Sequence, residues 1–166
     1  MNTNLPAALI TGASCVIGRS IAGLLAEHGP ALILTARRAH LLESTAADLR
    51  AAHGVPVHVV PHDLSKPGSA AELYNFVAEL GRPVEVLVNN AGFGLQGQFA
   101  ETELGAQLQL LQVNIMALTE LTHLFLQPML ERRSGRILNV SSIAAFVPGP
   151  LMATYHASKA YVLSFS

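Results

Sequence analysis

The chain has 166 residues, of which 51% are hydrophobic and 13% charged, and its formal net charge is −1. A chain of this length corresponds to about one domain and can bury roughly 70% of its unfolded surface. The near-neutral charge, with no run of Lys or Arg longer than a pair, argues against a nucleic-acid or anionic-membrane partner and favours small-molecule chemistry. We therefore expect one domain over residues 1–166.

The N-terminus and the cysteine content indicate the compartment. The opening MNTNLP is polar and does not resemble a signal peptide, and no apolar run is long enough to cross a bilayer. The single cysteine, Cys15, excludes an internal disulfide framework. These features predict a cytoplasmic protein without a membrane partner.

Apolar runs typical of strands alternate with segments of helical period from the first residues onward. The first helix should present one apolar face, formed by Ile17, Ile21, Leu24 and Leu25, and should end at Gly29-Pro30. In chain order, the first half predicts a strand at 7–11, this helix, a strand at 31–36, a helix at 39–52, a strand at 55–60, a helix at 69–80 and a strand at 84–89.

The second half predicts one long helix, one strand and a last helix. The long helix should run from Leu104 to about Arg133, with Pro128 as a kink and Gly135 after its end. Its apolar residues are spaced alternately by four and three: Leu104, Leu108, Leu111, Ile115, Leu118 and Thr122. A fifth strand is expected at 136–141 and a last helix from about Thr154 onward.

This alternation predicts the α/β class, with a Rossmann-type doubly wound parallel sheet. In such a sheet the ligand binds at the carboxyl ends of the strands, where the strand order reverses. The segment TGASCVIG at 11–18 joins the first strand to the first helix, where backbone N–H groups and the helix dipole suit a pyrophosphate. Two glycines in such a turn also occur without a ligand, so that alternative stays open.

The end of the second strand indicates which dinucleotide would bind. NAD-binding folds place an acidic residue on the ribose 2′-hydroxyl about 20 residues beyond the glycine loop, whereas an arginine there suits a 2′-phosphate. Here the strand ends in Thr35-Ala36-Arg37-Arg38, which offers no carboxylate. NADP(H) is therefore favoured over NAD(H), with Arg37 on the phosphate; alternatively, both arginines are ordinary solvated charges.

Tyr155 and Lys159 lie four residues apart at the start of the last expected helix, so their side chains share one face. The sequence YHASK at 155–159 resembles the YxxxK motif of the classical short-chain dehydrogenases/reductases. NNAG at 89–92, Asn114 and NVSS at 139–142 agree with further motifs of that family in order and spacing, as does the glycine loop. The resemblance covers the whole chain.

The resemblance implies a hydride-transfer site. Tyr155 would be the general acid/base, Lys159 would stabilise its phenolate and hold the nicotinamide ribose, Ser142 would polarise the carbonyl, and Asn114 would hold a water in a proton relay. Ser142 rather than Ser141 is assigned because it precedes Tyr155 by 13 residues. The resemblance places the cofactor against Gly12, Ser14, Ile17, Gly18, Arg37, Asp63, Leu64, Asn90, Ala91 and Gly92, together with Tyr155 and Lys159, with Asp63 at the adenine.

Structural roles remain open for several of these residues. The 89–92 segment could mainly tie the central strands together through its amides, and Asp63 could be a turn residue. Cys15 is most simply a small filler. The seven histidines show no ligand spacing, so no metal site is expected.

The chain departs from the family pattern in two places. Val16 stands where the family's glycine loop has its middle glycine; a β-branched residue there is disfavoured at φ > 0 and would block approach of the pyrophosphate, so we expect weakened cofactor binding. The family also continues beyond the last helix with two more strands and a segment that closes over the substrate. We therefore expect a sheet without those two strands, and a 166-residue chain that associates and turns over poorly.

The leading functional hypothesis is an NADP(H)-dependent oxidoreductase acting on a small-molecule carbonyl or secondary alcohol, a homodimer or homotetramer when full length. The main alternative is a non-catalytic nucleotide-binding or dimerisation remnant of such an enzyme. A sugar-nucleotide epimerase would need TGxxGxxG, and Cys15 stands in place of its glycine.

Overall fold

Five parallel strands form one sheet in the order β3-β2-β1-β4-β5. The computed structural model describes residues 5–166. The strands are β1 (Ala7–Thr11), β2 (Ala31–Ala36), β3 (Val57–Pro61), β4 (Val84–Asn89) and β5 (Arg136–Asn139). This order confirms the predicted Rossmann-type doubly wound sheet, and its switch point lies between β1 and β4.

Two strands have different bounds from those predicted. The third begins at Val57 rather than at 55, because the helix before it ends in the left-handed Gly54 and because Pro56 has no N–H to donate to the ladder. The fifth ends at Asn139 rather than at 141, since its neighbour β4 ends at the paired residue Asn89.

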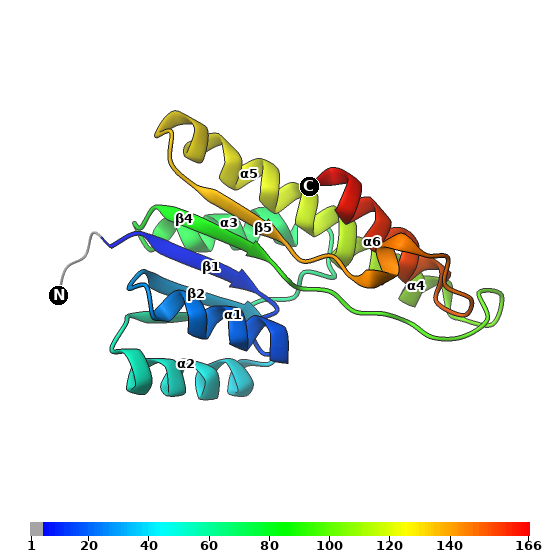
Figure 1. Cartoon of the computed structure of the whole chain (residues 1–166), viewed down its shortest axis with the longest axis horizontal. Coiled ribbons are helices and arrows are strands. Elements are labelled where there is room, and N and C mark those ends of the chain that lie inside the picture. The colour runs from blue at the N-terminus through cyan, green and yellow to red at the C-terminus, as the bar shows by residue number, and fades with distance from the viewer. Residues whose placement is uncertain (1–4) are drawn as a thin grey trace.

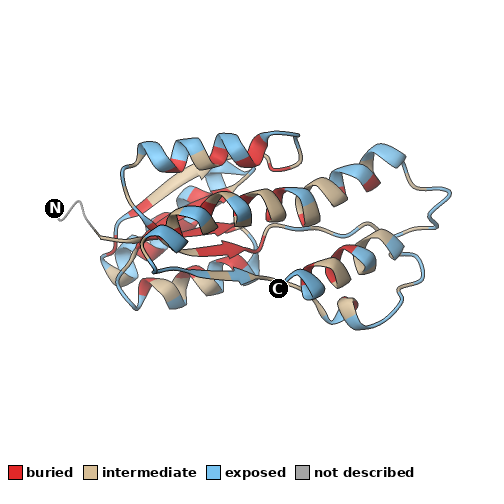
Figure 2. Cartoon of the chain, turned by 90° about the horizontal axis from the view of Figure 1, so that it is seen from above, coloured by how far each residue is buried: buried red, intermediate tan, exposed pale blue. Residues whose placement is uncertain are grey.

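Helices cover both faces of the sheet (Figure 1). Those longer than one or two turns are α1 (Val16–Ala26), α2 (Ala39–His53), α3 (Ser69–Glu79), α4 (Leu104–Leu111), α5 (Leu118–Glu131) and α6 (Ala153–Phe165). The α1 and α2 helices pack on one face, α3 and α5 on the other, and each side has its own apolar cluster. Figure 2 shows that the buried residues follow the strands and the inward stripes of the helices. Within 5–166, no helix combines the length and the apolar character needed to cross a bilayer.

Only part of the predicted apolar face of α1 meets the sheet: Ile21 and Leu25 pack against the apolar cluster on that side, as expected. Ile17 and Leu24 are more than half exposed, whereas Gly18, Ala22 and Ala26 are buried. Small side chains let the helix axis approach the strands closely, so close packing rather than side-chain hydrophobicity selects this face.

The predicted long helix is interrupted by a π-helical segment, Gln112–Ala117. The extra residue of a π turn rotates the following residues about the axis, so one straight apolar stripe cannot face the sheet throughout. Leu104 and Leu108 are accordingly exposed, while α5 buries Leu118, Leu121, Phe125 and Met129. Pro128 lies inside α5, which continues to Glu131.

Candidate functional site

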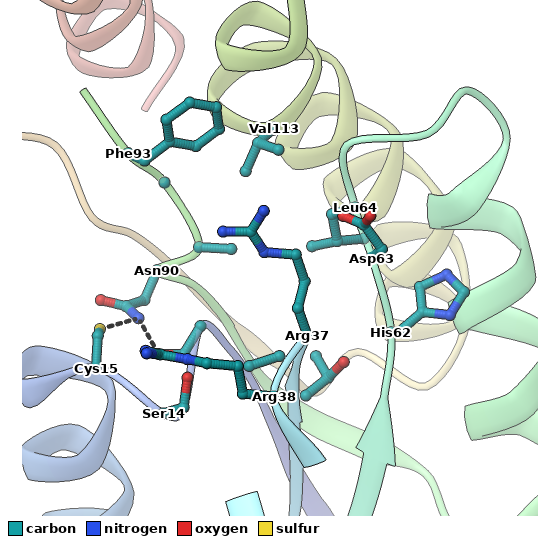
Figure 3. Close-up of a pocket in the computed structure, with 15 residues that line it drawn as sticks. Ser14, Cys15, Arg37, Arg38, His62, Asp63, Leu64, Asn90, Phe93 and Val113 are labelled. Carbon is teal, nitrogen blue, oxygen red and sulfur yellow. Dashed lines mark hydrogen bonds between the residues drawn. The ribbon is translucent and has the colours of Figure 1, made fainter. Parts of the chain in front are cut away.

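A cavity of about 160 Å³ opens at the carboxyl ends of the first four strands (Figure 3). It lies at the switch point of the sheet, where doubly wound folds bind ligands. Each of these strands contributes residues from its end or from the loop that follows it: Gly12, Ser14, Cys15, Thr35, Ala36, Arg37, Arg38, His62, Asp63, Leu64, Asn90, Ala91, Gly92 and Phe93, with Val113 from the π segment.

The glycine loop is folded tightly against the end of β4. Gly12 has a φ of 65°, a left-handed conformation that glycine adopts without strain. Gly18 is buried, and a Cβ there would overlap the Gly12 carbonyl oxygen and lie 2.9 Å from the Cα of Ala13. Both positions therefore require glycine, because the loop backbone packs too closely against neighbouring atoms to leave room for a side chain.

Cys15 is the N-cap of α1 and not merely a filler. Its Sγ accepts hydrogen bonds from the Gly18 N–H at 3.5 Å and from Asn90 Nδ2 at 3.4 Å. An N-cap acceptor satisfies one of the orphan amides at a helix start. Its position directly before the helix was the available sequence signal for this role.

Asn90 ties β4 to the glycine loop. Its Nδ2 donates to the carbonyl oxygens of Thr11 at 2.9 Å and Gly12 at 3.1 Å, and its N–H donates to the Thr11 hydroxyl. Asn89 in turn donates to Thr122 and Asn139. The amides of Asn89 and Asn90 therefore tie the central strands together, as the sequence analysis considered, and Asn90 also lines the cavity.

Two arginines and one carboxylate line the side of the cavity formed by β2 and β3. Figure 3 shows Arg37 extending from the end of β2 toward Val113. Asp63 accepts hydrogen bonds from the N–H and the hydroxyl of Ser65, which is an Asx turn. Partial burial alone would raise the pKa of Asp63, but these two bonds and the charges of Arg37 and Lys66 together lower it. Asp63 is thus an ionised turn residue that faces the cavity.

Val16 does not have the backbone conformation that the sequence suggested. It is the first residue of α1, and its φ is not positive, so the strain argument was wrong. Its side chain is 82% exposed at the N-terminus of the helix, and Val16 does not line the cavity. Of the two arguments that the sequence offered for Val16, only the one that its side chain would obstruct a pyrophosphate still applies.

Tyr155 and Lys159 share one face of α6, as expected. Lys159 is 6% exposed, and its Nζ donates to the Val140 carbonyl oxygen at 2.8 Å. Burial lowers the pKa of this amino group. The same Nζ lies 5.9 Å from the centre of the Tyr155 ring. A cation is thus held beside the tyrosine.

The π segment places Asn114 in the middle of this arrangement. Its Oδ1 accepts from the Phe93 N–H, and its Nδ2 donates to the Phe93 carbonyl and to the Ser158 hydroxyl, at 3.0–3.1 Å. Ser158, fully buried, donates to the Tyr155 carbonyl oxygen at 2.7 Å. Sequence reasoning missed Ser158, because a serine inside YxxxK carries no distinguishing signal.

The two serines after β5 have different partners. The Ser141 hydroxyl donates to the Lys159 carbonyl oxygen at 2.9 Å and so ties the loop to α6. The Ser142 oxygen accepts from the Ala144 N–H, and its proton has no acceptor within residues 5–166. Only Ser142 keeps a donor for a ligand.

The structure brings most of the predicted cofactor residues together around one cavity. Those that line it are Gly12, Ser14, Arg37, Asp63, Leu64, Asn90, Ala91 and Gly92. Gly18 lies behind the loop, and Ile17 is exposed on α1. Gly92 connects the cavity to the cluster of Asn114, Tyr155 and Lys159. A Cβ at Gly92 would lie 3.1 Å from Asn114 Oδ1 and 3.5 Å from Lys159 Nζ.

Comparisons with known proteins agree with this architecture. A family profile described as short chain dehydrogenase matches residues 6–166. The chain is 38% identical over 163 residues to a very-long-chain 3-oxoacyl-CoA reductase of Laccaria bicolor, covering 96% of this chain and 48% of that protein. The chain thus spans about half the length of the curated relatives it matches.

Solved structures give the same result. A short-chain dehydrogenase from Sphingobium yanoikuyae in complex with NADPH is 36% identical with a TM-score of 0.90, over 98% of this chain and 63% of that one. A bulky-bulky ketone specific alcohol dehydrogenase from Comamonas testosteroni is 33% identical with a TM-score of 0.91, over 98% and 64%. The chain therefore belongs to the short-chain dehydrogenase family.

Proposed function

We propose that this chain binds NADP(H) and carries the catalytic residues of an oxidoreductase that interconverts a carbonyl compound and a secondary alcohol. One observation carries the proposal: Gly92 lines the cavity and also lies against Asn114 and the buried Lys159 amino group, which itself lies beside Tyr155. A ligand that fills the cavity and extends past Gly92 would reach the tyrosine. The named similarities to proteins that bind NADPH or reduce ketones support it.

The residues present fit a dinucleotide. Gly12 and Gly18 let the loop before α1 pack closely against the end of β4, and Gly12 and Ser14 line the cavity. The N-terminus of α1 suits a pyrophosphate, and Arg37 offers a charge-assisted partner for a 2′-phosphate. Bound NADPH would supply the hydride. The best test is NADPH-dependent reduction of a panel of ketones by the full natural chain, and no turnover with any ketone would contradict the proposal.

The protein's own residues would handle the proton and the carbonyl oxygen. Tyr155 would donate its hydroxyl proton to the oxygen, and the Lys159 charge would stabilise the phenolate left behind. Ser142, with its uncommitted proton, would hold the carbonyl oxygen. The side-chain oxygen and the side-chain NH2 of Asn114 both already bond protein atoms. In a proton relay, Asn114 would therefore act by fixing the π segment beside Lys159.

Arg37→Ala should lower NADPH affinity by roughly ten- to hundredfold and leave NADH affinity nearly unchanged, because only NADPH carries the 2′-phosphate. Titration of both cofactors measures this. Arg38→Ala is the matched comparison, since Arg38 lines the same cavity. If Arg38→Ala alone removes the preference, the phosphate belongs to Arg38; if neither variant does, the NADP(H) assignment is wrong.

Val16→Gly should tighten NADPH binding, because it removes an exposed branched side chain from the helix end that would face the pyrophosphate. The same change should lower the free energy of unfolding by up to about 1 kcal/mol, since glycine is a poor helix residue. Cofactor titration and chemical denaturation check the two effects. Unchanged or weaker binding would show that Val16 does not obstruct the cofactor.

The proposal includes self-association of the full natural chain. Leu104, Leu108 and Met116 are each about half exposed or more along α4 and the π segment, a concentration of apolar surface that monomers seldom leave uncovered. Light scattering across a concentration series would measure the size, and a monomer throughout would contradict this part of the proposal.

A further inference from the structure

The loop that carries Ser142 meets one face of α6. Residues 145–149 of this loop line an open groove together with four residues of the helix: Ala153, His156, Ala157 and Ala160. Three of these four are alanines. His156 is therefore the only one of them whose side chain can donate a hydrogen bond to the loop.

The His156 side chain makes two contacts with the loop. Its Nδ1 lies 2.7 Å from the Val147 carbonyl oxygen. Because a carbonyl oxygen only accepts, Nδ1 carries a proton and donates it, in the neutral as in the charged ring. The ring also lies against Gly149, where a Cβ would overlap the Cδ2 and Nε2 atoms of His156. Any side chain at position 149 would displace the ring, so the approach of His156 explains this glycine.

Little else fixes this part of the loop. Within residues 5–166, the bond from His156 is the only hydrogen bond between residues 142–148 and another segment. Ile143 is 88% exposed and Phe146 is 72% exposed, and Val147 itself is exposed. Side-chain packing therefore holds the loop weakly, and His156 is its main anchor on α6.

Ser142 is joined to this anchored part by a short turn. Its Oγ accepts from the Ala144 N–H at 3.2 Å, and its carbonyl oxygen accepts from the Ala145 N–H at 3.0 Å. These bonds open the 3-10 helix Ile143–Phe146, which ends directly before Val147. A displacement of Val147 would therefore be passed back to Ser142 through one turn of backbone.

We propose that His156 is a positioning residue that fixes the Ser142 hydroxyl relative to Tyr155, its own neighbour on α6. The proposal rests on the proposed function, in which both hydroxyls act on the same carbonyl oxygen. An error of about 1 Å in such an arrangement can lower the rate roughly a hundredfold. His156 does not line the cofactor cavity, so its effect is confined to the reaction and does not extend to NADPH binding.

Asparagine and leucine at position 156 separate the hydrogen bond from the bulk of the side chain. The Nδ2 of asparagine takes the place of the histidine Nδ1, whereas leucine has the same branching and no donor. With the full natural chain, NADPH and a ketone that the wild type reduces, His156→Leu should lower kcat roughly ten- to hundredfold without changing the Kd of NADPH. His156→Asn should recover most of this loss. Leucine is the better helix residue, so a purely structural role would instead make His156→Leu the more active variant.

His28→Leu is the matched control. The His28 Nδ1 bonds the Leu24 carbonyl oxygen at 2.8 Å near the end of α1, so this variant removes the same kind of bond far along the chain from α6 and should keep the wild-type kcat. In a Ser142→Ala background, His156→Leu should cause little further loss, because the hydroxyl that it positions is already gone. A wild-type kcat in His156→Leu, an equal loss in the Ser142→Ala background, or no recovery in His156→Asn would overturn the proposal.

A measurement without turnover separates this proposal from the proposed function. The backbone amide NMR signals of Ala144 and Ala145, which report the two bonds to Ser142, should shift in His156→Leu and return toward their wild-type positions in His156→Asn. Gly149→Ala should shift them as well, because its Cβ would displace the ring from the loop side. Unmoved signals in both His156→Leu and Gly149→Ala would refute the anchor even if ketones are reduced. Shifted signals in a protein whose wild type reduces no ketone would support the anchor and contradict the proposed function.

Discussion

Tyr155→Phe is expected to lower the rate of carbonyl reduction by about 10²–10⁴-fold, the usual contribution of a general acid. NADPH affinity and the melting temperature should change little. The substitution removes one hydroxyl, and that hydroxyl makes no hydrogen bond to another residue within the part of the chain described by the structure. Steady-state kinetics on the full natural chain, with parallel cofactor titration, would measure both effects.

Tyr161→Phe is the matched control for this prediction. Tyr161 lies on the same helix, and its hydroxyl bonds the Thr119 hydroxyl at 2.8 Å, away from the cavity. Its loss should cost a modest amount of stability and leave turnover intact. Retention of more than roughly a tenth of the wild-type rate by Tyr155→Phe would rule out the acid/base role.

Gly18→Ala is expected to damage both the fold and the cofactor site. The new Cβ would overlap the Gly12 carbonyl oxygen and lie 2.8 Å from Asn90 Nδ2, so the glycine loop must move away from β4. Overpacking of this kind typically costs about 1–3 kcal/mol of unfolding free energy. NADPH affinity should fall well over tenfold, because the displaced backbone amides are those that would face the pyrophosphate.

Gly23→Ala provides the comparison on the same helix. A Cβ at Gly23 meets no atom within 4 Å, and alanine is the better helix residue, so this variant should gain up to about 1 kcal/mol and bind NADPH normally. Denaturation curves and cofactor titrations of the two variants separate a packing effect from a general intolerance of α1 to substitution. Normal NADPH binding by Gly18→Ala would contradict the role assigned to the loop.

The strands were predictable because their burial leaves a strong trace in the sequence. β1 and β2 are almost entirely apolar, and β4 is apolar apart from Glu85 and the terminal Asn89; the bounds of all three matched the prediction. The faces of the helices were less predictable. Periodicity alone identified Ile17 and Leu24 as part of the apolar face of α1, but the helix buries Ala22 and Ala26 against the sheet instead. How closely a helix approaches a sheet depends on the shapes of both surfaces, which periodicity does not describe.

The candidate site was predictable to the extent that its residues belong to contiguous motifs. The glycine loop, Arg37 and the pair Tyr155 and Lys159 all follow from local spacing, and the strand order places the first two beside one cavity. Their partners were not predictable. Val140 holds Lys159 through a backbone carbonyl, which carries no signal in the residue type.

By itself, the sequence determined the α/β class, the order of the elements and the motifs that indicated the family, because backbone hydrogen bonding and burial impose short periods that can be read locally. Only the tertiary structure decided the conformations and contacts that depend on distant segments. The π segment that brings Asn114 to Phe93, and the meeting of Met152 and Tyr155 at Gly94, are such cases. Each is set by packing between residues far apart in the chain, and no local pattern encodes the balance of contacts that fixes them.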